Sequence, residues 1–546
     1  MGDRSSAGEE HLSSSSRFSR SDTTILAGGT VVDGGGAPRY TADVVLEGSR
    51  IAAVEPAGSF RPPGARVVDI SGLTLAPGFI DVHSHSDNAP FLPDPDVSKI
   101  LQGVTTDVVG NCGMSPAPRS AAHEAVLESY LERLFPPVAW EGRSWHAYWE
   151  AARGGMVTNV APLVGQGALR LAVMGMERRP ATEAERRAMR ALLREALDDG
   201  AFGFSTGLIY PPGIFTDTDE LIDLARELGP HVYASHIRGE GDNLTEAVAE
   251  ALAIGRDAGV QVEVSHHKAG GRQNWGKTRD TLAMIDAARA GGQRVFQDVY
   301  PYTAGSTILT ACLPPWSQEG GNEAMLRRLH DPDALRRLRR DLEDGLPGFD
   351  SELHNAGADG IVLSSTKDGR YEGESLAAIA ARLGVDAIEA LFRILREEEL
   401  SATMVVFLMD EKDVVRVLTH PYTMIGSDAL PPGRGGKPHP RSFGTFPRIL
   451  GHYGRERGLL TLEEAVYKMS GLPAETFHIP ERGRIAPGLV ADLVVLEAPA
   501  VIDRATYENP VATPLGIKSV YLAGRQVVAG GRYVGARNGT LLRPAL

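Results

Sequence analysis

Two histidines separated by a single serine, His83 and His85, close an apolar segment that begins at Leu73. The apolar run predicts a buried strand, and because side chains alternate between the two faces of a strand, both imidazoles point to the same side. Neutral imidazole is a good ligand for zinc and similar divalent ions, so the pair could form half of a metal site. On its own, such a pair is equally typical of solvated or structurally satisfied histidines.

The same kinds of side chain end other strand-like segments of the chain. They are Cys112 after 107–109, His236 after 232–235, His266 after 262–265 and Asp428 after 424–427. A lone cysteine or histidine after an apolar run is more often structural than functional. So many nitrogen, sulfur and carboxylate ligands at strand ends are far less expected by chance, and together they predict one site.

Eight strand-like runs in the centre of the chain alternate with helix-like runs such as 184–201 and 243–258. The strands end near His83, Gly110, Gly165, Gly207, His236, His266, Tyr300 and Asp428. This alternation predicts an α/β fold, a (β/α)8 TIM barrel with its chemistry at the C-terminal ends of the strands. A doubly wound sheet is the alternative. For the helix 243–258, Asn243 and Glu246 are expected to act as N-cap and N3 partner.

Two further strand-like runs, 360–363 and 404–407, do not fit the count of eight. At least the first is assigned to an insertion of roughly 310–365, which we expect to cover the site as a lid because long additions to barrel loops lie at that face. A peripheral excursion without function is the alternative.

The two ends of the chain, 23–72 and 481–546, are both rich in short β segments. Neither is long enough for a comfortable core of its own, so we expect them to form one small β-sandwich domain. That leaves 73–480 as the catalytic barrel. Residues 1–22 are rich in Ser, Arg, Glu and Asp and lack the apolar core of a signal peptide, a composition typical of a disordered tail.

The composition is that of an ordinary globular protein of 546 residues, 42% hydrophobic and 23% charged. A net charge of −14 argues against a nucleic-acid partner and against docking on an anionic membrane. Only two cysteines occur, Cys112 and Cys312, and no apolar run reaches the length of a membrane span. We therefore expect a cytoplasmic protein, with Cys312 an idle thiol. Its oligomeric state stays open.

Read in order, the motifs resemble the metal-dependent amidohydrolase superfamily and, within it, the N-acyl-D-amino-acid deacylases (D-aminoacylases). The resemblance covers roughly residues 23–535 and is carried by the stretches 77–85, 110–113, 203–213, 235–241, 265–268, 300–307, 425–428 and 439–441. It implies zinc-dependent hydrolysis of the amide bond of small-molecule N-acyl-D-amino acids, giving a carboxylate and a free D-amino acid. The D configuration rests on the resemblance alone.

The resemblance also implies a role for each matched residue. Cys112, His236 and His266 would hold one Zn²⁺ tightly, and His83 and His85 would contribute to a second, weaker site that Cys112 could bridge. Zinc makes a nucleophile of water at neutral pH. The matched catalytic residue is Asp428, which would take the proton from that water and hand it to the leaving nitrogen.

Four residues match the substrate contacts of the resembled family: Lys268, Tyr300, Ser306 and Arg441. The planar fork of Arg441 suits bidentate binding of an α-carboxylate. On residue type alone, Lys268 could instead form a structural salt bridge, and Tyr300 could be an ordinary aromatic at a strand end.

Some features depart from relatives or leave alternatives open. Cyclic-amide hydrolases of the superfamily carry a carboxylated lysine at the fourth strand, whereas 201–207 has none, which favours the deacylases. A cyclic-amide hydrolase or isopeptidase remains the second enzyme hypothesis, and a non-catalytic scaffold the hypothesis from another class. Gln166 stands where a histidine is expected, and the Gly/Pro-rich stretch 431–438 could change how Arg441 reaches the substrate. His267 should point away from His266 and be structural.

Overall fold

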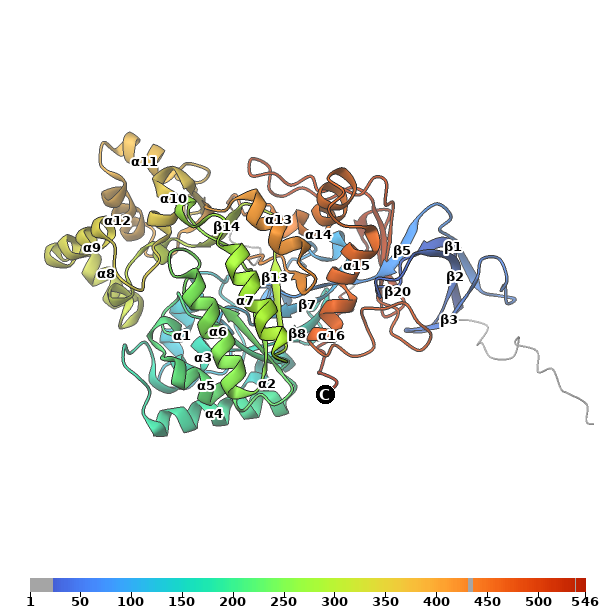
Figure 1. The fold of residues 1–546 in the computed structure, drawn as a ribbon, viewed down its shortest axis with the longest axis horizontal. Helices are drawn as coiled ribbons and strands as arrows, with labels where there is room; N and C mark the ends of the chain where they lie inside the picture. Colours follow the sequence, from blue (N-terminus) through green and yellow to red (C-terminus); the bar gives the residue numbers. More distant parts are fainter. Residues whose placement is uncertain (1–22, 431–435, 536) are drawn as a thin grey trace, which may run out of the picture.

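The computed structural model describes residues 23–430, 436–535 and 537–546, so the predicted tail 1–22 lies outside the described residues. All eight predicted central strands are present, and β7, β8 and β13 are labelled near the centre of Figure 1. They are β6 (Phe79–Asp81), β7 (Val104–Val109), β8 (Asn159–Pro162) continued by β9 (Val164–Gly165), β10 (Gly203–Gly207), β11 (Val232–His236), β12 (Gln261–Val264), β13 (Val295–Val299) and β17 (Thr423–Ile425). Most of their residues are buried, as expected for parallel strands covered on both faces.

These strands pair in parallel and in chain order. One sheet has the order β6-β7-β8 and the other β9-β10-β11-β12-β13-β17. A single residue separates β8 from β9, and a parallel bridge between Ser84 and Ala429 joins the ends of β6 and β17. The ring is therefore closed like that of a (β/α)8 barrel, and the carboxyl ends of all its strands meet at one face. A doubly wound sheet would stay open.

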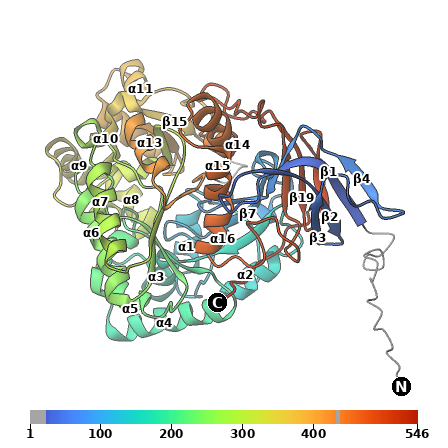
Figure 2. The same cartoon turned by 45° about the vertical axis from the view of Figure 1, so that its right-hand side comes forward.

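Helices α3 (Gln166–Met174), α4 (Glu183–Asp198), α5 (Thr218–Ala225), α6 (Leu244–Ala258) and α7 (Thr278–Ala290) follow the strands, and α4 to α7 lie side by side on the outside of the barrel (Figure 2). A capping box between Thr182 and Glu185 begins α4, and Gly259 in the left-handed conformation ends α6. Asn243 occupies the N-cap position of α6 as expected, but its side chain makes no capping bond. Its amide nitrogen instead donates to Asp350 Oδ1 at 2.9 Å.

Strands from both ends of the chain form one nine-stranded sheet. They are β1 (Thr23–Val31), β2 (Tyr40–Glu47), β3 (Arg50–Pro56), β4 (Arg66–Asp69), β5 (Thr74–Pro77), β18 (Leu493–Leu496), β19 (Ile517–Leu522), β20 (Arg525–Ala529) and β21 (Arg532–Tyr533). The antiparallel pair β5–β18 joins the two halves, so β5 belongs to this sheet although it follows residue 73. After β21 the chain returns to the barrel, where Leu541 bridges Val160.

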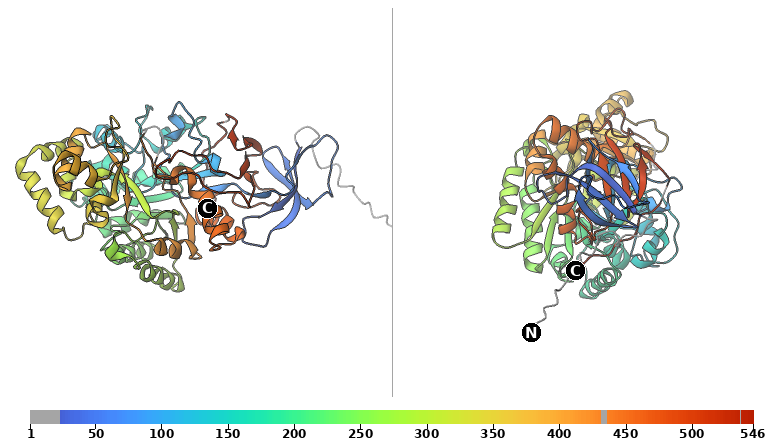
Figure 3. Two further views of the ribbon diagram at one scale, coloured as in Figure 1. Left: turned by 90° about the horizontal axis from the view of Figure 1, so that it is seen from above. Right: turned by 90° about the vertical axis from the view of Figure 1, so that its right-hand side faces the viewer.

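A second region is inserted between β13 and β17. Its antiparallel sheet has the order β14-β16-β15, formed by β14 (Ala304–Ile308), β15 (Ile361–Ser365) and β16 (Thr403–Phe407). Its helices are α8 (Gly321–His330), α9 (Pro332–Asp344), α10 (Glu352–Gly360), α11 (Leu376–Leu383) and α12 (Ala387–Glu397). The inserted region thus runs from β14 to β16, which is longer than the expected 310–365. It lies at the opposite end of the molecule from the nine-stranded sheet (Figures 1 and 3).

The remaining helices connect these parts. They are α1 (Glu124–Leu131), α2 (Trp145–Ala152), α13 (Glu411–Thr419), α14 (Arg441–Arg448), the π-helix Ile449–Glu456, α15 (Leu462–Met469) and α16 (Gly471–Thr476). Among the described residues, no helix has both the length and the apolar character needed to cross a membrane.

Candidate metal centre and active site

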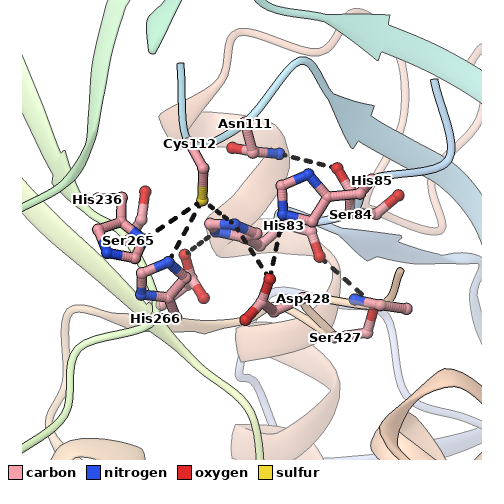
Figure 4. Close-up of polar contacts among 12 residues, drawn as sticks. His83, Ser84, His85, Asn111, Cys112, His236, Ser265, His266, Ser427 and Asp428 are labelled. Carbon is pink, nitrogen blue, oxygen red and sulfur yellow. Dashed lines mark hydrogen bonds and ion pairs between the residues drawn. The ribbon is translucent and has the colours of Figure 1, made fainter. Parts of the chain in front are cut away.

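Six of the predicted site residues converge at the carboxyl face of the barrel (Figure 4). They lie at the ends of five parallel strands: His83 and His85 after β6, Cys112 after β7, His236 at the end of β11, His266 after β12 and Asp428 after β17. All six are buried. Because parallel strands bring their carboxyl ends to one face, residues more than 300 positions apart in the chain reach one another.

The thiol of Cys112 lies at the centre of this cluster. Its Sγ is 3.3 Å from His83 Nε2, 3.4 Å from His266 Nε2 and 3.6 Å from His236 Nδ1. Ligand atoms lie within 4.8 Å of one another in three groups: Cys112, His236 and His266; His83, His85 and Cys112; and His83, His266 and Asp428. One thiol is therefore shared by two potential ligand sets, and a set of one thiolate and two imidazoles fits zinc.

The protonation states of these groups favour a bound cation. Burial lowers the pKa of His236 and of His266 well below the usual value, which keeps both imidazoles in the neutral form that binds metals. Burial, reinforced by Asp428, raises the pKa of the Cys112 thiol well above its usual value. Because a buried thiolate needs a compensating positive charge, the donor set as a whole is suited to a metal ion.

The backbone is strained where it presents these side chains. Cys112, His266 and Asp428 have φ values of 53°, 36° and 49°, in the left-handed region that residues other than glycine rarely adopt. Such strain persists at sites where the surrounding structure enforces it. Next to Cys112, a Cβ at Gly113 would lie 2.8 Å from the backbone nitrogen of Gly207, so only glycine fits this turn.

Two carboxylates that sequence reasoning did not single out orient the histidines. Asp298 Oδ2 lies 3.1 Å from His83 Nδ1, and Glu240 Oε1 lies 3.0 Å from His266 Nδ1, which is also 2.7 Å from Lys268 Nζ. When Nδ1–H of His83 donates to Asp298, its Nε2 presents a lone pair toward Cys112. The available signal was their position, since Asp298 is an acidic residue inside a buried strand and Glu240 lies in the matched stretch 235–241.

His267 faces away from the cluster, as predicted. Its Nδ1 is 2.5 Å from Gln297 Oε1 and its Nε2 is 2.8 Å from Thr281 Oγ1, so both ring nitrogens are used in packing the barrel wall. Gln166 donates to Thr216 Oγ1 at 2.7 Å and is not among the residues that line the pocket.

Asp428 lies between the histidines and an arginine. Its Oδ1 is 3.2 Å from His85 Nε2, and its Oδ2 is 2.8 Å from Arg441 Nη1. Burial by itself would raise the pKa of Asp428, but the Arg441 guanidinium and the contact with His85 outweigh it and hold this pKa well below the usual value. The carboxylate is therefore ionised and able to accept a proton at neutral pH.

The pocket beside the cluster is lined by three of the four predicted substrate-binding residues: Lys268, Tyr300 and Ser306. Lys268 Nζ lies 2.5 Å from Glu240 Oε1, so it also forms the salt bridge considered as its alternative. The Tyr300 ring lies 5.6 Å from Lys268 Nζ and 4.7 Å from Arg441 Cζ, measured to the ring centroid.

Arg441 is fully buried and is not among the lining residues. Besides its ion pair with Asp428, it donates from Nη2 to the carbonyl oxygen of Ser306 at 3.1 Å. Its Nε has no hydrogen-bond partner within the described ranges, which leaves one donor unused. Residues 431–435 of the preceding Gly/Pro-rich stretch lie outside the described residues.

Comparison with known proteins agrees with this geometry. The Amidohydrolase family matches residues 66–528. An N-acyl-D-aspartate deacylase of Alcaligenes xylosoxydans xylosoxydans is 40% identical over 525 residues, 95% of either chain. An N-acyl-D-glutamate deacylase of the same organism is 41% identical over 508 residues, 92% of either chain. The chain belongs to the D-aminoacylase family of amidohydrolases.

Solved structures of D-aminoacylase family members share the fold of this chain. A D-aminoacylase with a binuclear metal centre, in which one metal activates and the second attenuates, matches with a TM-score of 0.81 and 39% identity over 95% of this chain and 99% of its own. An N-acyl-D-glutamate deacylase of Bordetella bronchiseptica, in complex with zinc and a phosphonate mimic of the tetrahedral intermediate, matches with a TM-score of 0.78 and 39% identity over 96% of this chain and 100% of its own. The α/β amidohydrolase fold is therefore shared.

Proposed function

We propose that the chain hydrolyses the amide bond of N-acyl-D-amino acids, releasing a carboxylate and a free D-amino acid, with zinc as its metal. The observation that carries this proposal is the buried Cys112 thiol, whose Sγ lies within 3.6 Å of nitrogens from three histidines. The ionised carboxylate of Asp428 lines the same pocket. A shared thiolate, neutral imidazoles and a nearby base are what metal-assisted amide hydrolysis requires.

Cys112, His236 and His266 would hold one zinc ion tightly, and His83 and His85 would form a second, weaker site with Cys112 as the bridge. Bound there, zinc would lower the pKa of a water molecule to about 7 and polarise the carbonyl group of the amide. Asp298 keeps Nε2 of His83 directed at the cluster, whereas Nδ1 of His266 lies between Glu240 and Lys268.

Asp428 is the proton carrier in this proposal. Its Oδ2 is held by Arg441, which leaves Oδ1, on the side of His85, to accept a proton from the attacking water. The same oxygen then donates that proton to the amide nitrogen as the carbon–nitrogen bond breaks. Because Arg441 keeps the carboxylate ionised, the base is ready before the substrate binds.

Lys268 and Tyr300 would bind the α-carboxylate of the substrate from the pocket wall, with Ser306 beside them. Arg441 supports the same end of the pocket, since its guanidinium lies against the Tyr300 ring and retains an unpaired Nε donor. Nε is the donor of Arg441 that the Asp428 ion pair and the Ser306 carbonyl leave open, and a guanidinium N–H forms a strong charge-assisted hydrogen bond with a carboxylate.

The inserted region would act as a lid. Lining residues come from β14 and β16 (Ser306, Thr307, Ile308 and Val406) and from the first residue of α10, Glu352. A wall on this side of the pocket would exclude bulk water, which strengthens the electrostatic interactions of Asp428 and Lys268 inside the pocket.

Metal analysis of the purified protein, combined with hydrolysis of N-acetyl-D-methionine and N-acetyl-L-methionine, tests the proposal. We expect cleavage of the D isomer alone, loss of activity on chelation and its return with added zinc. A zinc-loaded protein that cleaves neither isomer, or both equally well, would contradict the proposed activity.

A further inference from the structure

Sequence identity to the relatives does not decide which side chain the amino-acid part of the substrate carries. This chain is 40% identical to an N-acyl-D-aspartate deacylase, 41% identical to an N-acyl-D-glutamate deacylase and 39% identical to a D-aminoacylase. These values are too close to choose among acidic and other side chains. The residues that line the pocket provide a more direct criterion.

Apart from the cluster and its neighbours, six lining side chains are apolar and uncharged hydroxyls come from Tyr210, Ser306 and Thr307; the apolar ones are Met114, Leu134, Ile308, Val406, Leu408 and Leu430. Apolar walls favour an uncharged side chain, because a buried charge without a partner loses its hydration. This part of the pocket therefore offers no compensation to a charged substituent.

Positive charge in the pocket is already used. Among the described lining residues, Lys268 is the only lysine or arginine, and its Nζ is 2.5 Å from Glu240 Oε1. Arg441 lies behind the lining and pairs with Asp428. Since the proposed function assigns Lys268 to the α-carboxylate, a second carboxylate on the substrate would have no cation of its own.

The pocket also contains a carboxyl group that the proposed reaction does not use. Glu352, the first residue of α10, lines the pocket and is 9% exposed, and within the described ranges its carboxyl group makes no hydrogen bond or ion pair. Burial raises the pKa of Glu352 to about 8, with Glu240 and Asp350 raising it and Lys268 lowering it. The mechanism proposed above gives this carboxyl no task.

We propose that Glu352, together with the apolar lining, makes this enzyme selective for N-acyl-D-amino acids whose side chain carries no negative charge. The inference rests on the proposed deacylase function. Glu352 is then a specificity-determining residue contributed by the inserted region. Substrates related to aspartate and glutamate are rejected because their second carboxylate is buried without a counter-ion, and above the pKa of Glu352 it also lies beside a like-charged group.

N-acetyl-D-glutamine and N-acetyl-D-glutamate form a matched pair for the test, because they have nearly the same shape and differ in charge. We expect kcat/KM of the wild-type enzyme to be higher for the glutamine substrate by roughly 100-fold, the usual penalty for a charged group that loses its partner. The ratio should increase from about pH 7 to about pH 9, because Glu352 becomes ionised as the pH rises past its pKa. Glu240, Asp350, Lys268 and the Tyr300 hydroxyl are the other titratable groups around it.

The variant Glu352→Gln should reduce that ratio at about pH 9 by roughly tenfold and remove its increase with pH, because the amide cannot ionise. Glu323→Gln is the matched control, since it changes a carboxyl on α8 of the same inserted region whose side chain is 94% exposed. It should leave the ratio and its pH dependence as in the wild type.

Equal kcat/KM for the two substrates in the wild type would overturn the selectivity, and an unchanged ratio in Glu352→Gln would overturn the role of Glu352. If the variant does not fold, the ratio of kcat/KM for the two substrates in the wild type, and its change with pH, still test the selectivity. Failure to cleave N-acetyl-D-leucine as well as both members of the pair would instead overturn the proposed function, so the two failures are distinguishable.

Discussion

The barrel strand ends and the inserted region meet at one pocket but contribute different chemistry to it. The strand ends and the turns after them supply the thiol, the imidazoles and the base: His85, Cys112, His236, His266 and Asp428. The inserted region supplies apolar side chains, the hydroxyls of Ser306 and Thr307 and the carboxyl of Glu352. The difference suggests that the reaction is carried by the barrel and the choice of substrate by the insertion, as is common when loops are added to one fold.

The two regions also differ in backbone conformation. Cys112, His266 and Asp428 have positive φ values, whereas Ser306, Ile308 and Val406 lie in regular antiparallel strands. Strain is therefore found where side chains must be aimed at one point, and the substrate wall has ordinary geometry. Substitutions in the first region should affect every substrate, and those in the second should affect only some.

The largest effect is expected for Cys112→Ala. It removes the thiol shared by two ligand sets, so bound zinc should fall to about one tenth of an ion per chain or less. Hydrolysis of every N-acyl-D-amino acid should be lost with it. Metal analysis and kinetics on the same sample measure both. Full zinc content with normal turnover would contradict the role of Cys112 as a zinc ligand.

Asp428→Asn should separate the base from the metal. Zinc should stay bound, while kcat falls by about 1,000-fold, a typical contribution of general acid–base catalysis. His267→Gln changes a buried histidine outside the cluster and serves as the control for perturbation of the barrel wall. Near-normal turnover in Asp428→Asn would contradict the proton transfer assigned to this residue.

Arg441→Ala tests a residue that is assigned both to substrate binding and to keeping Asp428 ionised. Its loss should raise KM by about 100-fold, the usual scale for removing one partner of a buried charge pair. Because Arg441 holds the pKa of Asp428 low, its removal should raise that pKa. The base is active when deprotonated, so the acid limb of the kcat/KM profile should move to higher pH. An equal loss on a substrate whose carboxylate is capped as an amide would show that Arg441 acts through Asp428 alone.

Leu408→Ala is expected to have the smallest effect and to sharpen the comparison between regions. The change widens the apolar lining, so kcat/KM for N-acetyl-D-leucine should fall by about tenfold, the scale of losing apolar contact in a pocket. Zinc content should not change. A smaller substrate, N-acetyl-D-alanine, provides the reference, and an equal decrease for both substrates would indicate a general defect.

The cluster could be predicted from the sequence because each of its members follows a short apolar run, and parallel strands bring such ends together. His83, His85, Cys112, His236 and Asp428 needed only that local pattern. The orienting residues Asp298 and Glu240 could not be found in this way, since one buried acid and one loop acid resemble many others until their distances to the histidines are known.

The extent of the inserted region could not be predicted from short sequence patterns either. Its sheet pairs β14 with β16, whose residues Ala304 and Phe407 are about one hundred positions apart, and no short pattern specifies such a pairing. Asn243 shows the same limit on a smaller scale. It occupies the N-cap position, but its side-chain oxygen accepts no capping bond, and its amide nitrogen donates to Asp350 of the inserted region at 2.9 Å.

The central claim is that zinc is held by a thiolate at the carboxyl face of the barrel. X-ray absorption at the zinc edge, on protein loaded with one equivalent of the metal, tests it most directly. The account predicts one sulfur ligand at about 2.3 Å together with nitrogen ligands at about 2.0–2.1 Å, and loss of the sulfur signal in Cys112→Ala. A zinc site with nitrogen and oxygen ligands only, unchanged in Cys112→Ala, would contradict it.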